Sequence, residues 1–216
     1  MQVVLANGSI IDANATSNAH LFPALKGGQS NFGVVTSFDI NTYPKTKFWG
    51  GAIQYPETAD TAQLAAFTAF KTHPYDPFAE VEQTYVYFEP NITSVLTFQS
   101  IPPPPGANTP QNSLPFSSDS APQNNVVLAL FSMYWPNAKG STVVESSVRN
   151  LTRSVQQLVG EEENFKYLNY AASWQDPIGS YGEATVEQLR RTATLYDPDA
   201  FFQRVVSGGF KLRVGY

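Results

Sequence analysis

The residues best suited to chemistry form a glycine-rich turn at residues 26–36, which read Lys-Gly-Gly-Gln-Ser-Asn-Phe-Gly-Val-Val-Thr. Gly27, Gly28 and Gly33 allow backbone angles and close approaches that a Cβ atom forbids, while the Val-Val-Thr run that follows favours a strand. Such a turn can simply stop a helix, or it can let a ligand lie against its backbone. Composition does not decide between these two interpretations.

Several classes of active site are excluded by residue type. The glycine spacing matches neither the G-x-G-x-x-G dinucleotide-binding turn nor the phosphate-binding P-loop. The chain has no Cys, which excludes disulfides and thiolate chemistry. His20 and His73 are the two histidines and lie far apart in sequence. Without a nucleophile-elbow pattern they give poor support to a hydrolytic triad, and we expect no metal site.

The charge and hydropathy of the chain limit the classes of partner that we expect it to bind. The formal net charge is -5, and the 13 Lys and Arg residues are scattered, so no basic patch is expected for a nucleic acid. No apolar stretch approaches the roughly 20 residues that cross a bilayer, and the opening residues do not read as a signal peptide. We therefore expect neither nucleic acid nor a membrane as partner.

Four Asn-x-Ser/Thr sequons begin at Asn7, Asn14, Asn91 and Asn150. Sequons are glycosylation acceptors that face solvent in proteins of the secretory pathway. Chance alone produces some such sites in a chain rich in Asn, Ser and Thr. The expected localisation is secreted or within the secretory pathway.

The elements that position the glycine-rich turn come first in the chain. Turn signals and periodicity predict strands at 3–5 and 9–12 around Asn7-Gly8, a helix at 18–26 and a strand at 33–42. Asn18 is the expected N-cap of that helix, and Gly27-Gly28 is its expected stop. The segment therefore reads strand, strand, helix, strand.

A second lobe follows. Alternation and helical spacing predict strands at 48–55, 83–89, 94–100 and 125–134, and helices at 58–71 and 142–159. This order is typical of an α+β lobe with a mainly antiparallel sheet covered by helices. Tyr85, Tyr87, Phe131 and Tyr134 either line a pocket or simply alternate along half-buried strands. The proline-rich residues 102–122 are expected to form one exposed loop, as a surface insertion or a binding loop.

The tail holds a second informative stretch, Tyr167-Leu168-Asn169-Tyr170. A helix is predicted at 183–195, and Asp197-Pro198 is its stop because the residue before Pro avoids helical angles.

These stretches together resemble the berberine-bridge-enzyme-like FAD-linked oxidases of the vanillyl-alcohol oxidase and p-cresol methylhydroxylase superfamily, which have PCMH-type FAD-binding domains. The family wording is close to A-N-G, then L-F-W-A-L-[KR]-G-G-G-x-N-F-G-[IV]-V-T. Here Pro23 replaces the usual Trp and Gln29 replaces the third Gly. The family's closing module is matched by Tyr167-Leu168-Asn169-Tyr170, Tyr181-Gly182, Tyr196-Asp197-Pro198 and Phe201-Phe202.

The resemblance implies FAD as cofactor and a small-molecule substrate. It implies that Gly27, Gly28, Asn31 and Gly33 lie beside the cofactor and that Asn169 contacts the flavin. Tyr170 would be the catalytic base, with Tyr167 as a further candidate. A phenol has an unperturbed pKa near ~10, so this role requires a cationic or hydrogen-bonding neighbour.

The implied function is FAD-dependent oxidation of an alcohol, a sugar or a specialised metabolite by removal of a hydride. In the family the FAD phosphates are held by an N-terminal half that this sequence does not show, so we expect the isolated chain to bind FAD weakly and to be inactive. The alternative is a flavin-free binding or scaffold protein of the same family.

The expected fold class is α+β, with an antiparallel-sheet substrate lobe and a remnant of the flavin-binding domain built from both chain ends. The predicted boundaries are 1–45 for the FAD-domain part, 46–163 for the substrate lobe and 164–216 for the closing module. Asn31 and Asn169-Tyr170 would then share one cleft between the lobes.

Overall fold

The computed structural model describes residues 1–42, 44–72, 76, 79–101, 112–115, 126–160 and 165–212. Helices and two small antiparallel sheets confirm the α+β class. The chain forms two compact units: the first comprises residues 1–47, 104–121 and 165–216, and the second comprises 48–103 and 122–164. Each unit is described by itself.

The sheet of the first unit has the strand order β2-β1-β3, formed by β1 (Gln2–Val4), β2 (Ile10–Asp12) and β3 (Val34–Ser37). Both pairings of β1 are antiparallel, and Val3 lies opposite Ile11 and Val35. Gly8 has φ +80° in the turn between β1 and β2, which only glycine adopts at no steric cost. The predicted hairpin is therefore confirmed, whereas the predicted strand at 33–42 is shorter than expected.

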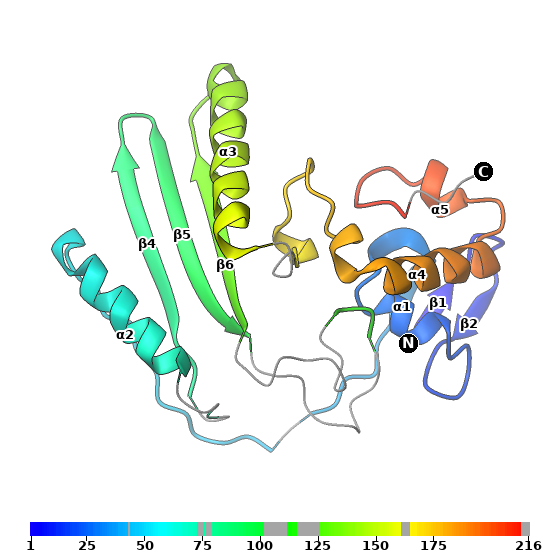
Figure 1. Cartoon of the computed structure of the whole chain (residues 1–216). Coiled ribbons are helices and arrows are strands. Elements are labelled where there is room, and N and C mark those ends of the chain that lie inside the picture. Colours follow the sequence, from blue (N-terminus) through cyan, green and yellow to red (C-terminus); the bar gives the residue numbers. More distant parts are fainter. Residues whose placement is uncertain are drawn as a thin grey trace. The chain divides into compact units, whose positions relative to one another are not determined.

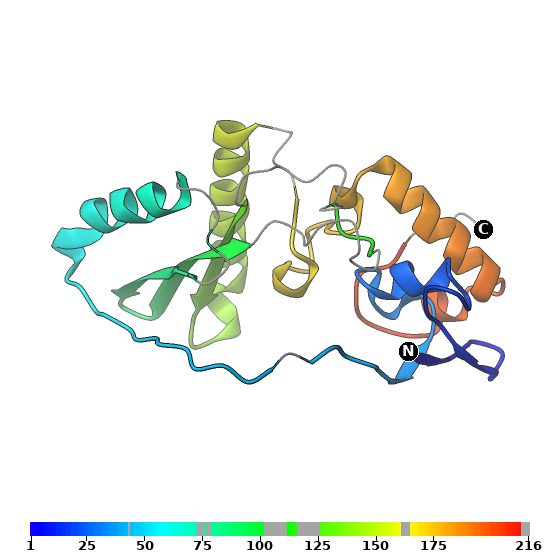
Figure 2. The same cartoon turned by 90° about the horizontal axis from the view of Figure 1, so that it is seen from below.

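The helices of the first unit come from both ends of the chain. They are α1 (Leu21–Leu25), η1 (Gln29–Asn31), η5 (Leu168–Tyr170), η6 (Gly179–Tyr181), α4 (Glu183–Tyr196) and α5 (Phe201–Arg204). Helix α1 contacts α4 (Figures 1 and 2). Between them lies a core that joins Leu21 and Phe32 to Leu189 and Ala193, all at most 1% exposed.

The predicted N-cap of the first helix is wrong. Helix α1 begins at Leu21, after His20, and no side chain caps it. Asn18 has φ +50°, and its side-chain amide donates to the carbonyl of Asp12 instead. Because the amide bonds back to the end of β2, it stabilises the entry to the helix rather than the first helical turn.

The second unit contains a three-stranded antiparallel sheet in the order β4-β5-β6, seen as three long arrows side by side in Figure 1. Its elements are η2 (Glu57–Ala59), α2 (Asp60–Thr72), β4 (Glu82–Glu89), β5 (Ile92–Ile101), β6 (Val126–Tyr134), η3 (Ala138–Gly140) and α3 (Ser141–Val159). Alternation and helical spacing predicted these strands and both long helices to within a few residues.

The predicted strand at 48–55 is wrong. Residues 48–55 have no regular secondary structure, and Phe48 and Trp49 are each 94% exposed. Strand propensity alone does not form a strand, because a strand needs a partner for its backbone groups and a surface for its side chains.

Most of the proline-rich stretch 102–122 lies outside the described residues, and Asn112–Pro115 is the described part. Here the amide of Ser113 donates to the carbonyl of Lys26, and its hydroxyl donates to the carbonyl of Pro23. This short piece therefore covers the end of α1, a role that its proline-rich context did not indicate.

Candidate functional site

The glycine-rich turn begins where α1 ends. The amide of Gly28 donates to the carbonyl of Ala24 at 2.9 Å, and Gly27 has φ +126°, a conformation that side chains disfavour. The hydroxyl of Tyr181 donates to the carbonyl of Gly27 at 3.0 Å. The Gly27–Gly28 peptide is thus hydrogen-bonded through both its carbonyl and its amide, which fixes the turn.

Two of the glycines are required by packing within the chain. A Cβ atom on Gly28 would lie 2.5 Å from both the Ala24 carbonyl oxygen and the Phe32 ring, and one on Gly33 would lie 2.5 Å from Val3. Real Cβ atoms do not approach other atoms so closely. The structure therefore gives these glycines a role in the fold, while their contact with a cofactor stays a prediction.

Asn31 is fully buried and its amide is fully used. Its nitrogen donates to the carbonyls of Gly28 at 2.7 Å and Phe210 at 2.9 Å, and its oxygen accepts from the Gln203 side chain at 3.0 Å. An amide nitrogen has two hydrogens to donate. Asn31 therefore joins the turn to the far end of the chain, and any effect on a cofactor would pass through the shape of the turn.

Gln29 stands where the resembled family has a third glycine. Its φ of +58° lies in the left-handed region that favours glycine. Its side-chain oxygen accepts from the amide of Phe210 at 2.7 Å. The contact directs the extra side chain toward residues 209–210 and offsets part of the conformational cost.

The residues predicted to act on substrate lie together at η5, with Tyr167 just before its first residue and Tyr170 at its end. The rings of Tyr167 and Tyr170 meet edge to face at 5.0 Å between centroids, and the amide of Asn169 donates to the Tyr167 hydroxyl at 2.8 Å. Tyr170 is 43% exposed, and its hydroxyl makes no hydrogen bond to any described residue. Tyr170 is therefore accessible, and Asn169 and Tyr167 fix its surroundings.

Tyr181 was noted in the sequence only as part of the closing module, yet it joins the two predicted halves of the site. It is 3% exposed. Burial, and the nearby Tyr167, raise the pKa of Tyr181 to about 12. Tyr181 is therefore a lasting hydrogen-bond donor and no base at neutral pH. A Tyr-Gly pair just before a helix was the one available signal for it.

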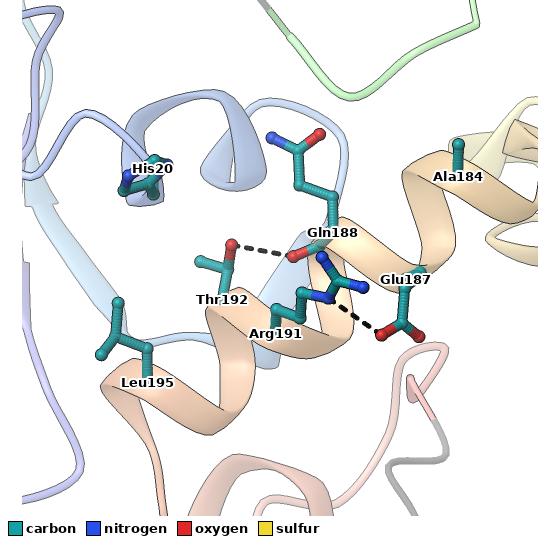
Figure 3. A pocket seen from close by; sticks show the side chains of 7 residues that line it. All are labelled: His20, Ala184, Glu187, Gln188, Arg191, Thr192 and Leu195. Carbon is teal, nitrogen blue, oxygen red and sulfur yellow. Dashed lines mark hydrogen bonds and ion pairs between the residues drawn. The ribbon is translucent and has the colours of Figure 1, made fainter.

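A surface hollow of about 640 Å³ lies elsewhere in the first unit, along α4 (Figure 3). Its lining residues are His20, Ala184, Glu187, Gln188, Arg191, Thr192 and Leu195. Arg191 is paired with Glu187 at 3.0 Å, and the Thr192 hydroxyl donates to the Gln188 carbonyl. With these groups already paired, the hollow offers no nucleophile and base in contact, and it does not include the predicted site residues.

The aromatic residues of the second sheet divide between its two faces. Tyr85 pairs with Leu96 and through it with Phe131, so these side chains share a face. Tyr87 lies on the same face, where its hydroxyl donates to the Asp60 carboxylate at 3.0 Å, and that hydrogen bond raises the pKa of Tyr87. Tyr134 points to the opposite face. The four residues therefore do not line one pocket.

Neither a metal site nor a membrane span is found within the described part of the chain. No group of three or more His, Cys, Asp and Glu residues gathers there as metal ligands would. None of its helices is both long and apolar enough to span a bilayer.

Comparisons with known proteins give relatives over nearly the whole chain. An FAD-dependent monooxygenase of Aspergillus calidoustus is 28% identical over 97% of this chain and 58% of its own length, and one of Emericella nidulans is 27% identical over 98% and 64%. An uncharacterized FAD-linked oxidoreductase of Arthroderma benhamiae is 37% identical over 48% of this chain and 21% of its own length. No family model and no solved structure matches.

The matches also show a difference in length. The chain spans about three fifths of the first two relatives. The stretch matched to the Aspergillus protein is 306 positions long although it uses 97% of a 216-residue chain, so about a third of its positions have no counterpart here. Over almost all its residues the chain is thus similar to part of proteins named as FAD-dependent monooxygenases.

Proposed function

We propose that this chain is the substrate-side part of an FAD-linked oxidoreductase that acts on a small organic molecule. The observation that carries the proposal is the match of 97–98% of the chain to relatives named as FAD-dependent monooxygenases. The finer assignment, to berberine-bridge-enzyme-like oxidases, rests on the turn at residues 26–36 and on the Tyr-Leu-Asn-Tyr stretch. Four exposed sequons are compatible with a secreted protein.

The residues present fit the ring end of a flavin better than its phosphates. Tyr170 offers an exposed aromatic ring, and Asn169 an exposed side chain beside it, which suit a flat ring that carries polar edges. Diphosphate needs a glycine-rich loop with free amides or a helix N-terminus aimed at it, and the glycines at 28 and 33 pack against their own chain. The phosphates would therefore be held by residues other than these.

In this proposal Tyr170 accepts a proton from the substrate hydroxyl as a phenolate. Tyr170 is exposed and its hydroxyl makes no hydrogen bond to a described residue, so the cationic or hydrogen-bonding neighbour that this role requires would come from the FAD-holding part. Tyr167 and Asn169 hold the Tyr170 ring in place through the edge-to-face contact and the hydrogen bond between them. Bound FAD would supply the hydride acceptor. The chain's own residues orient the substrate and move the proton.

The test is Tyr170→Phe in the polypeptide that also carries an FAD-holding half, with Tyr134→Phe as a matched exposed-tyrosine control. We expect the rate of flavin reduction by substrate to fall on the order of 100-fold, as for loss of a general base, while FAD stays bound. The control should keep its rate. Stopped-flow absorbance measures both, and an unchanged rate in Tyr170→Phe would exclude its role as the base.

A second candidate is monooxygenation, which the names of the relatives favour. An oxidase returns electrons to oxygen without placing oxygen in the product, whereas a monooxygenase inserts one oxygen atom. A reaction under ¹⁸O₂ separates the two by the mass of the product. If the complete protein binds no flavin but still binds small molecules, the flavin-free alternative replaces both.

A further inference from the structure

We infer that Tyr181 is a positioning residue that couples the glycine-rich turn to the tyrosine-bearing turn at 167–170. The inference rests on the proposed function, because both turns are the ones proposed to face the flavin. Tyr181 lies on η6, 154 positions after Gly27, and donates its hydroxyl to the Gly27 carbonyl at 3.0 Å. Tyr181 itself is 3% exposed.

The first half of the coupling is the Gly27–Gly28 peptide. Its carbonyl accepts from Tyr181, and its amide donates to the carbonyl of Ala24 at 2.9 Å. A peptide unit is planar, so two hydrogen bonds at its opposite edges fix its orientation. With φ +126° at Gly27, the backbone itself is free to rotate more than at other residues, and the hydrogen bonds restrict that rotation.

The second half of the coupling is the chain that leads into η5. The ring of Phe165 stacks on that of Tyr181 at 6.1 Å between centroids and 26° between planes. The next residue, Lys166, donates its amide to the hydroxyl of Ser180, also on η6, at 3.0 Å. Residues 165–166 are therefore held by η6, one residue before Tyr167 and its edge-to-face contact with Tyr170.

Tyr181 and Tyr170 have different environments and therefore different roles. Tyr181 is buried, its pKa is raised to about 12, and it therefore stays protonated as a donor at any ordinary pH. Tyr170 is exposed and its hydroxyl is unpaired within the described residues. Loss of the Tyr181 hydroxyl would leave the half-buried Gly27 carbonyl without this hydrogen bond, which lets the glycine-rich turn relax.

The test compares Tyr181→Phe with Tyr196→Phe. The Tyr196 hydroxyl also makes one hydrogen bond in the first unit, to the Asn18 side chain at 3.1 Å, but it does not contact the turn. In hydrogen exchange on the chain without cofactor, Tyr181→Phe should speed exchange of residues 24–33 and 165–171 at least 10-fold relative to Tyr196→Phe. Equal exchange in the two variants would overturn the coupling.

Phe165→Leu is the second variant, in case Tyr181→Phe does not fold. It keeps the hydroxyl and removes the ring stack, so exchange should rise most at 165–171 and, because Tyr181 joins the two turns, by a smaller factor at 24–33. A rise in neither segment contradicts the coupling. In the flavin-loaded protein, Tyr181→Phe should lower kcat on the order of 10-fold with little change in KM and shift the flavin absorption spectrum. A wild-type protein without flavin would contradict the proposed function, while exchange would still decide the coupling.

Discussion

The two units use similar lengths of chain but bury their side chains very differently. Among the described residues, the buried hydrophobic side chains lie in the first unit, with the exceptions of Phe67 and Val144. The second unit nevertheless has the longer strands, with every residue of β4 paired to β5. Strand pairing is therefore continuous along β4 and β5 where side-chain burial is lacking.

The difference teaches that a regular sheet is not by itself a core. Large hydrophobic side chains of the second unit stay exposed, among them Phe48, Trp49, Ile53, Phe88 and Leu158. About a third of the positions matched in the Aspergillus relative have no counterpart in this chain, which is enough chain for several covering elements. Exposed apolar groups of this number need a cover to contribute to stability.

The sharpest test of the comparison is a core truncation in the first unit. Phe32 is fully buried beside Leu21 in the same core, so Phe32→Ala should lower the free energy of unfolding by about 3–5 kcal/mol. Urea denaturation followed by fluorescence measures it. Phe48→Ala, at a 94% exposed position, is the control and should change stability by less than about 0.5 kcal/mol.

A second test removes a buried carboxylate of the first unit. The two oxygens of Asp197 accept the amides of Phe201 and Phe202, each at 2.8 Å, at the start of α5. Asp197→Ala should cost about 3 kcal/mol, because two hydrogen bonds to a charged group are lost. Asp197→Asn keeps one acceptor and should cost less. Equal losses in the two variants would mean that the hydrogen bonds to Asp197 do not stabilise α5.

A third test uses alkaline pH. The pKa of Tyr181 is raised from 10.0 to about 12 on folding, so the unfolded state loses its proton first. The contribution of the protonated Tyr181 side chain to stability is fully present below pH 10 and is lost as the pH rises toward 12. The total loss is about 2–3 kcal/mol. The pKa values of other tyrosines are raised too. The measurement is therefore the difference in unfolding free energy between wild type and Tyr181→Phe. The stability of Tyr181→Phe should fall less steeply over this range.

The smallest effect on the unfolding free energy is expected for an exposed hydrophobic side chain of the second unit. Leu158 is 86% exposed near the end of α3, and Leu158→Lys should change the unfolding free energy by about 0.5 kcal/mol at most. Val144→Ala, at a buried position of the same helix, should cost about 1–3 kcal/mol. A loss for Leu158→Lys as large as that for Val144→Ala would break the comparison, because it would reveal a cover over α3.

Local sequence signals predicted the elements whose pattern is also local. The hairpin around Asn7-Gly8, the strands β4 to β6 and the helices α2, α3 and α4 follow from turn residues and periodicity. The failures depend on distant partners: residues 48–55 have strand propensity but no strand beside them, and Asn18 bonds backward to Asp12. No local pattern shows which distant residue is a partner.

The candidate site likewise has features that the sequence predicted and features that it did not. The sequence indicated the residues, because glycines before a strand and a Tyr-Leu-Asn-Tyr stretch are visible in it. It did not indicate that the side-chain amide of Asn31 is hydrogen-bonded to Gly28, Phe210 and Gln203, or that the Tyr181 hydroxyl is hydrogen-bonded to Gly27. Apart from the Asn31–Gly28 hydrogen bond, these contacts join positions more than 150 residues apart, and only folding brings them together.

The hydrogen bond between Asn31 and Phe210 joins positions 179 residues apart, and this separation has a consequence during synthesis. The amide of Asn31 lacks this acceptor until Phe210 has left the ribosome. At ≈ 5–20 residues per second, that interval lasts roughly 10–40 s. For most of it, Leu21 and Phe32 are without the α4 residues that later bury them. The nascent chain therefore displays side chains that are fully buried in the folded protein for most of this interval.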